Sequence, residues 1–74
     1  MTISNESELV SEVYAIVANG LASDLAQCLE PGDRLTGAMI AECAIDTLYD
    51  DFTKDFEVTP QMEKKIAKSM NYYV

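Results

Sequence analysis

The fold is decided by residues 34–57, which read RLTGAMIAECAIDTLYDDFTKDFE. Apolar residues recur in this stretch every three or four positions, which is the period of an α-helix. At about 100° per residue, one arc of the predicted helix collects large apolar side chains and is expected to face the core. This predicted core arc consists of Ala41, Ile45, Leu48, Tyr49, Phe52 and Phe56.

Helix-breaking residues bound this stretch on both sides. Pro31-Gly32 precedes it, and Val58-Thr59-Pro60 follows it. The breaks leave three predicted helices, at residues 5–29, 34–57 and 60–73. Their short connections are typical of antiparallel helix neighbours, and no alternating β-pattern or repeat is present. The sequence therefore predicts a single all-α domain over residues 1–74, a compact bundle of three helices.

Residues that cap helices stand at the predicted starts. Asn5 followed by Glu8 fits the reciprocal capping arrangement for the first helix. Thr59 offers a hydroxyl cap before a proline at the first helical position of the last helix. Asp33 or Thr36 could cap the second helix.

The first segment carries the widest apolar surface, so we expect it to be the central, most buried helix. Its apolar residues are Leu9, Val10, Val13, Tyr14, Val17, Leu21, Leu25 and Cys28. A continuous helix would aim Asp24 into this surface, and an unpaired buried carboxylate is costly. Asn19-Gly20 tolerates the left-handed conformation that ends a helix. We therefore favour a break there, which gives the bundle four helices and places Asp24 near the start of the new one.

Carboxylates border the predicted core arc of the second segment. Glu42, Asp46 and Asp50 follow one another at i, i+4 and i+8 on one side, and Asp51 and Asp55 lie on the opposite flank. Like charges at this spacing destabilise a helix by about 0.2–0.5 kcal/mol per pair. The row is either a solvated face or a surface that docks on arginines and lysines. Its rise of about 6 Å per turn is close to the roughly 7 Å between phosphates of an extended strand, so it could imitate a short phosphate track.

Met39, Ile40 and Cys43 lie away from the core arc and form a second, smaller apolar patch. A helix that is apolar on two sides is either sandwiched between its neighbours or presents one side to another molecule. The patch therefore predicts sandwiching by the other two helices, or else a homodimer or partner interface.

The last segment separates its apolar and basic residues. Its apolar stripe consists of Met62, Ile66, Met70 and Tyr73. Lys64, Lys65 and Lys68 occupy the opposite face, where they suit the negative C-terminal end of the helix dipole. The alternative is that they neutralise the acidic row of a neighbouring subunit. Tyr72 adds aromatic area of the kind found at interface hot spots.

The charge of the whole chain restricts its partners. It has 13 acidic and 5 basic residues, a net charge of −8, and all but one of the acidic residues lie between Glu6 and Glu57. Such a field repels nucleic acid and membrane headgroups and attracts basic protein surfaces. We therefore expect a protein partner with a cationic groove, and neither direct nucleic-acid binding nor membrane binding.

The two cysteines, Cys28 and Cys43, lie in apolar periodic segments and are predicted to be reduced core thiols of a cytoplasmic protein. An antiparallel hairpin would leave them about two helical turns out of register, beyond disulfide reach. No apolar stretch approaches the ~20 residues that span a membrane, so we expect a soluble chain.

Catalysis and tightly bound cofactors are not predicted. The chain has no histidine, and two well-separated cysteines do not make a zinc site. The cluster Asp50-Asp51-x-x-x-Asp55-x-Glu57 lacks the alternating oxygens and central glycine of an EF-hand, which leaves loose divalent binding at most. Acyl carrier proteins share the size and acidity, but their Asp-Ser-Leu motif is absent, and Ser23-Asp24-Leu25 has the first two residues reversed.

In size, charge and expected helicity the chain resembles small acidic phage-encoded inhibitors, including many anti-CRISPR proteins and other DNA mimics. The resemblance implies a protein of the host cytoplasm that blocks a CRISPR effector complex, or another nucleic-acid-handling protein, by occupying its basic surface. The partner-binding residues that it implies are Glu42, Asp46, Asp50, Asp51, Asp55 and Tyr72. The C-terminal lysines depart from a uniformly acidic mimic, so a steric block at another face fits equally well.

A second class of function starts from the apolar faces rather than from the charge. In that interpretation the chain is a small helical oligomerisation or regulatory module, such as an antitoxin-like protein or a phage assembly factor. The Met39, Ile40 and Cys43 patch would then pair two copies of the chain.

Overall fold

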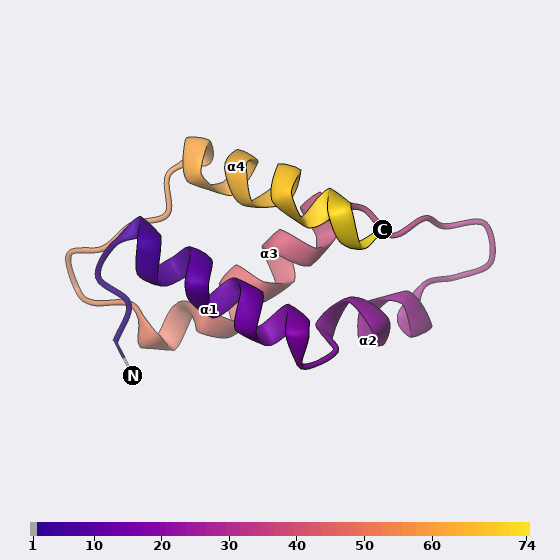
Figure 1. Ribbon diagram of the computed structural model, residues 1–74, viewed down its shortest axis with the longest axis horizontal. Helices are drawn as coiled ribbons and strands as arrows, with labels where there is room; N and C mark the ends of the chain where they lie inside the picture. The colour runs from indigo at the N-terminus through magenta and orange to yellow at the C-terminus, as the bar shows by residue number, and fades with distance from the viewer. Residues whose placement is uncertain (1) are drawn as a thin grey trace.

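The computed structural model describes residues 2–74. Its elements are α1 (Glu6–Ala18), α2 (Leu21–Cys28), α3 (Gly37–Leu48), the 3₁₀ turn η1 (Tyr49–Asp51), α4 (Pro60–Met70) and the 3₁₀ turn η2 (Asn71–Tyr73). α3 contacts α1, α2 and α4, and α4 runs antiparallel beside it (Figure 1). The all-α fold class is confirmed, with four α-helices in place of three.

The predicted break at Asn19-Gly20 is confirmed. Gly20 has a φ of 107°, in the left-handed region that favours glycine, and the chain bends by 63° between α1 and α2. Asp24 lies exposed in the first turn of α2, where the helix dipole favours a negative charge. Within residues 2–74 no single helix is long and apolar enough to cross a membrane, and only α1 and α2 together, across this bend, reach such a length and composition.

The residues predicted to cap the helices do so, except that Glu8 bonds a different group of Asn5 from the one expected. Asn5 Oδ1 accepts a hydrogen bond from the backbone N–H of Glu8 at 2.9 Å. Glu8 Oε1 in turn accepts from the side-chain amide of Asn5 at 2.8 Å, rather than from its backbone N–H. Thr36, and not Asp33, caps α3, and Thr59 caps α4; each hydroxyl accepts from the N–H three residues later at 3.2 Å.

The core is formed by α1, α3 and α4, together with Ile3. Its buried residues are Ile3, Leu9, Val13, Val17, Ile40, Ala41, Ala44, Leu48, Ile66 and Met70. α2 contributes none of them. The prediction that the first segment is the most buried helix was therefore wrong. Because the chain bends after α1, Leu21 and Leu25 are only half-buried, and α3 takes the central place.

The core face of α3 is rotated from the predicted arc. Ala41 and Leu48 are buried as predicted, but Ile40, which was assigned to the second patch, is fully buried as well. Tyr49, which was assigned to the core, is 70% exposed. The buried side of α3 is centred roughly 70° from the predicted arc on a helix of 100° per residue. The rotation follows from α4, which packs against the side of α3 that carries Gly37 and Ile40.

Gly37 brings α3 and α4 into close contact. Its backbone N–H, free at the start of α3, donates to Asn71 Oδ1 at 2.9 Å. A Cβ atom at Gly37 would overlap the backbone oxygen of Ala67 and the side-chain oxygen of Asn71. Only glycine fits this position without displacement of α4.

Ile3 ties the start of the chain to the segment after η1. Its N–H donates to the carbonyl of Asp51 at 2.7 Å, and its carbonyl accepts from the N–H of Thr53 at 2.9 Å. These two bonds form an isolated parallel bridge between Ile3 and Phe52, and the Ile3 side chain is fully buried. The sequence pattern had assigned no role to this residue.

The two cysteines are free, as predicted, but they are not both in the core. Cys28 is exposed, because α2 points its C-terminal turn away from the other helices, and Cys43 is half-buried. The prediction of two core thiols was therefore wrong for Cys28.

Candidate functional site

The helix that carries the predicted acidic row is shorter than the sequence indicated. α3 ends at Leu48, η1 carries the chain to Asp51, and residues 52–59 form a loop. Aspartates crowd the end of α3, which is the negative end of its dipole, and its last turn holds no basic residue to compensate them. The bridge to Ile3 then holds the following residues extended. The helix predicted for residues 34–57 was therefore too long at both ends.

The early end of α3 divides the predicted carboxylates into two groups. Glu42 and Asp46 lie exposed one turn apart on α3. Asp50 is exposed in η1, where the tighter 3₁₀ winding no longer continues the spacing of the row. Asp51 is half-buried in η1, and Asp55 is exposed in the loop. Asp51 and Asp55 therefore do not flank α3, as had been predicted, but belong to the segment that follows it.

The carboxylates of α3 are not neutralised from within the described chain. The one ion pair within residues 2–74 joins Lys65 Nζ of α4 to Glu6 Oε1 of α1 at 3.4 Å. Both side chains are exposed, and ion pairs of this kind contribute about 0–1 kcal/mol. The charge of Glu42 and Asp46 thus remains available to a partner.

A shallow hollow of about 460 Å³ lies over this part of α3, and we call it the α3 hollow. It is lined by Met39, Glu42, Cys43, Asp46 and Thr47. The Thr47 hydroxyl is turned inward and donates to the carbonyl of Cys43 at 2.8 Å. Lysine and arginine bury their aliphatic stems on apolar surface while their charged ends bind carboxylates. In the α3 hollow, the side chain of Met39 offers the apolar contact, and Glu42 and Asp46 offer the carboxylates.

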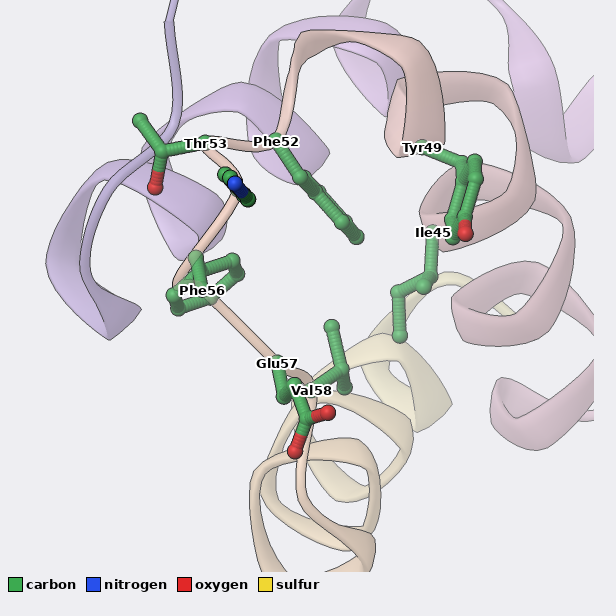
Figure 2. Close-up of a pocket in the computed structure, with 8 residues that line it drawn as sticks. Ile45, Tyr49, Phe52, Thr53, Phe56, Glu57 and Val58 are labelled. Carbon is green, nitrogen blue, oxygen red and sulfur yellow. The ribbon is translucent and has the colours of Figure 1, made fainter.

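A second hollow, of about 550 Å³, opens between the end of α3 and the loop (Figure 2). We call it the aromatic groove, and its lining residues are Ile45, Tyr49, Phe52, Thr53, Lys54, Phe56, Glu57 and Val58. Phe52 meets Phe56 edge to face with ring centroids 5.1 Å apart, and Tyr49 lies 5.8 Å from Phe52. In Figure 2, Phe52 extends into the groove toward Ile45, and Val58 points into it from the lower part of the view.

The two hollows lie on opposite flanks of the same carboxylate pair. On a helix of about 100° per residue, Ile45 and Tyr49 stand on one side of Glu42 and Asp46, and the α3 hollow's Met39 and Cys43 stand on the other. We call Glu42, Asp46 and Asp50, with the α3 hollow, the acidic face. Ile45, Phe52 and Phe56, which were predicted for the core, pack against it while their other sides line the aromatic groove.

Tyr72 is not brought to the acidic face. It lies in η2 with 87% of its surface exposed, and its ring meets that of Tyr73 edge to face at 5.4 Å. η2 packs at the start of α3 through Asn71, whereas the aromatic groove lies at the other end of that helix. The exposed aromatic residue next to the acidic face is Tyr49. The run of aspartates that follows Tyr49 was the signal in the sequence that the helix, and with it the core arc, ends there.

Within residues 2–74 no group of three or more aspartate, glutamate or cysteine side chains lies close enough together to hold a metal ion. The four acidic residues between Asp50 and Glu57 are therefore not gathered around a common centre.

No protein-family model, no curated protein and no solved structure matches this chain.

Proposed function

We propose that this chain is a stoichiometric protein-binding inhibitor that docks its acidic face on a basic surface of a larger complex. The observation that supports the proposal is the pair Glu42 and Asp46. Both are exposed, neither has an ion-pair partner within residues 2–74, and a hollow with a partly apolar lining lies on each side of them. Opposite charge combined with apolar contact is what a basic protein surface recognises.

The class of target comes from the resemblance to small acidic phage-encoded inhibitors. It is a nucleic-acid-handling complex, such as a CRISPR effector, in the host cytoplasm. Before the helix ends, Glu42 and Asp46 are the only two carboxylates of the row at a spacing close to that of neighbouring phosphates. The chain would therefore imitate only a short piece of a nucleic-acid backbone. The body of the chain, about 40 × 22 × 17 Å, would add a steric block over the occupied surface.

The size of the chain is compatible with this role. A standard protein interface buries about 800 Å² on each partner. That area is roughly a sixth of the 5167 Å² that the chain exposes. An interface of this size covers only part of the surface, so the acidic face and the aromatic groove can both belong to it together with the residues around them.

A capture experiment tests the proposal. The immobilised chain is exposed to bacterial lysates with and without an expressed CRISPR effector complex, at about 0.1 M and about 0.5 M salt. We expect a nucleic-acid-handling complex to be retained at the lower salt and released at the higher, since the screening length falls from about 10 Å to a few Å over this range.

Two outcomes of that capture would contradict the proposal. If retention of the partner did not weaken at the higher salt, the acidic face would not contribute to the interaction. Retention of the chain's own copies alone would favour the second function, an oligomerisation module. The observation that supports this alternative is the exposed apolar surface of Tyr72 and Val74, which are 87% and 58% exposed. A light-scattering mass of one chain at tens of micromolar would exclude an obligate oligomer.

A further inference from the structure

The aromatic groove has a mainly apolar lining and lies next to acidic residues of α3, η1 and the loop. Ile45, Tyr49, Phe52, Phe56 and Val58 supply its apolar lining. The charged side chains of the lining are Glu57 and Lys54, whereas Asp50, Asp51 and Asp55 belong to the same segment without lining the groove, and Glu42 and Asp46 lie beside it on α3. A complementary ligand therefore carries an apolar anchor together with positive charge.

Around Phe52 the backbone groups of the groove wall are already hydrogen-bonded, and the next residues, Lys54 and Asp55, form a turn and not an extended edge. The N–H of Phe52 donates to the carbonyl of Tyr49 at 3.2 Å, and the N–H of Thr53 is used by Ile3. The carbonyl of Asp51 is used by Ile3 as well. A peptide that binds by strand addition needs such groups free, whereas a helix in a groove binds through its side chains.

We propose that the aromatic groove takes the apolar anchor residues of a basic amphipathic helix of the protein partner. Its anchors, spaced three or four residues apart, contact Tyr49, Phe52 and Val58, and its lysines and arginines lie against the carboxylates that flank the groove. This inference rests on the proposed function, since it names the element of the partner that the acidic surface selects.

The test uses the full chain and a synthetic probe. The probe is a labelled peptide of about 18 residues, or five helical turns, made of leucine and lysine with the leucines on one helical face. Two further peptides serve as references: one of the same composition with its stripe scrambled, and an oligolysine of the same charge. We expect the striped peptide to bind at least about tenfold more tightly than either reference, with shifts of the amide resonances of Ile45, Tyr49 and residues 52–58 in a two-dimensional NMR titration.

Two tyrosine variants locate the binding. Tyr49→Ala removes a 70% exposed ring from the groove and should weaken the striped peptide by about tenfold, the effect of losing an interface aromatic. Tyr14→Ala, which removes a 40% exposed tyrosine from α1, is the matched control and should bind as the parent chain does. Both variants are first checked for an unchanged circular-dichroism spectrum.

The outcomes separate this inference from the function on which it rests. Equal binding of the striped peptide and oligolysine, or no effect of Tyr49→Ala, would overturn the helix-in-groove inference while the acidic face could still hold a partner. A salt-resistant capture would sink the proposed function even if the groove bound the peptide. If the chain formed a concentration-dependent dimer and Tyr49→Ala dissociated it, the groove would bind a second copy of the chain. That result would overturn the inference.

Discussion

Gly37→Ala is expected to destabilise the domain by about 3 kcal/mol, the upper part of the range for overpacking a tight contact. The added methyl would overlap the backbone of Ala67 and the side chain of Asn71, and its atom would lie 2.7 Å from the backbone nitrogen of Asn71. Backbone atoms cannot rotate away, so α4 must shift as a unit. That shift also lengthens the hydrogen bond from Gly37 to Asn71.

The consequence is large because the domain is small. Chains below roughly 80 residues rarely have more than about 3–5 kcal/mol of net stability from one core. A loss of 3 kcal/mol lowers the thermal midpoint of such a domain by about 12–24 °C. Thermal unfolding followed by circular dichroism measures the change.

The matched control for Gly37→Ala is Ala38→Ser, which adds one atom at the next, exposed position of the same helix turn. Its free energy of unfolding should change by less than about 0.5 kcal/mol. A Gly37→Ala midpoint within a few degrees of the parent chain would show that α3 and α4 do not approach each other this closely.

Ile3→Ala is expected to cost about 2–5 kcal/mol, as for other buried isoleucines cut back to alanine. The side chain is fully buried among residues of the core, although it lies before the first helix. Alanine keeps the two backbone bonds of residue 3 to Asp51 and Thr53, but without the buried side chain as an anchor these bonds should open more often, which loosens the loop that forms one wall of the aromatic groove. Urea unfolding gives the free energy, and amide hydrogen exchange at Thr53 reports on the loop.

Thr2→Ala is the control for Ile3, since Thr2 is the exposed neighbour in the same segment. It should leave both the urea midpoint and the exchange rate of the Thr53 amide unchanged. If Ile3→Ala behaved like Thr2→Ala, the start of the chain would not be part of the core.

Local signals in the sequence predicted the helices well. Asn5, Thr36 and Thr59 each cap a helix, and the left-handed Gly20 ends the first segment. These features depend on neighbouring residues only, so a sequence contains them in full. The four-helix alternative followed from Asn19-Gly20, and the all-α class followed from the helical period of the apolar residues.

Long-range contacts explain what the sequence did not predict. The rotation of α3 depends on how closely α4 approaches Gly37, and the end of α3 is fixed in part by a bridge to Ile3, about 50 residues away along the chain. Neither contact has a periodic signature. The five predicted carboxylates are therefore divided between α3 and the segment after it, and Tyr49 moved from the predicted core to the surface.

The sequence therefore predicted which residues make up the candidate site, but only part of their arrangement in space. Glu42 and Asp46 are exposed on one helix face, as the acidic row indicated, and Asp50 follows them in η1. The apolar residues next to them were predicted to be core: Ile45, Phe52 and Phe56 are half-buried and pack against it, whereas Tyr49 is exposed. An apolar arc that continues past the end of its helix has no second helix to cover it, and here it forms the aromatic groove.

Binding of the acidic face to a basic protein surface can be measured in a single titration. The partner retained in the capture experiment is titrated with the parent chain and with the triple variant Glu42→Gln, Asp46→Asn, Asp50→Asn. The control variant Glu12→Gln, Glu30→Gln, Glu63→Gln removes the same three negative charges from other surfaces.

We predict that the acidic-face variant binds about 100-fold more weakly than the parent chain, a loss of about 2.7 kcal/mol. Its thermal midpoint should be equal or slightly higher, because repulsion between like charges one turn apart is relieved. The control variant should bind within a few-fold of the parent. Equal dissociation constants for the two triple variants would contradict the account, since the position of the carboxylates on α3 and η1 would then have no part in recognition.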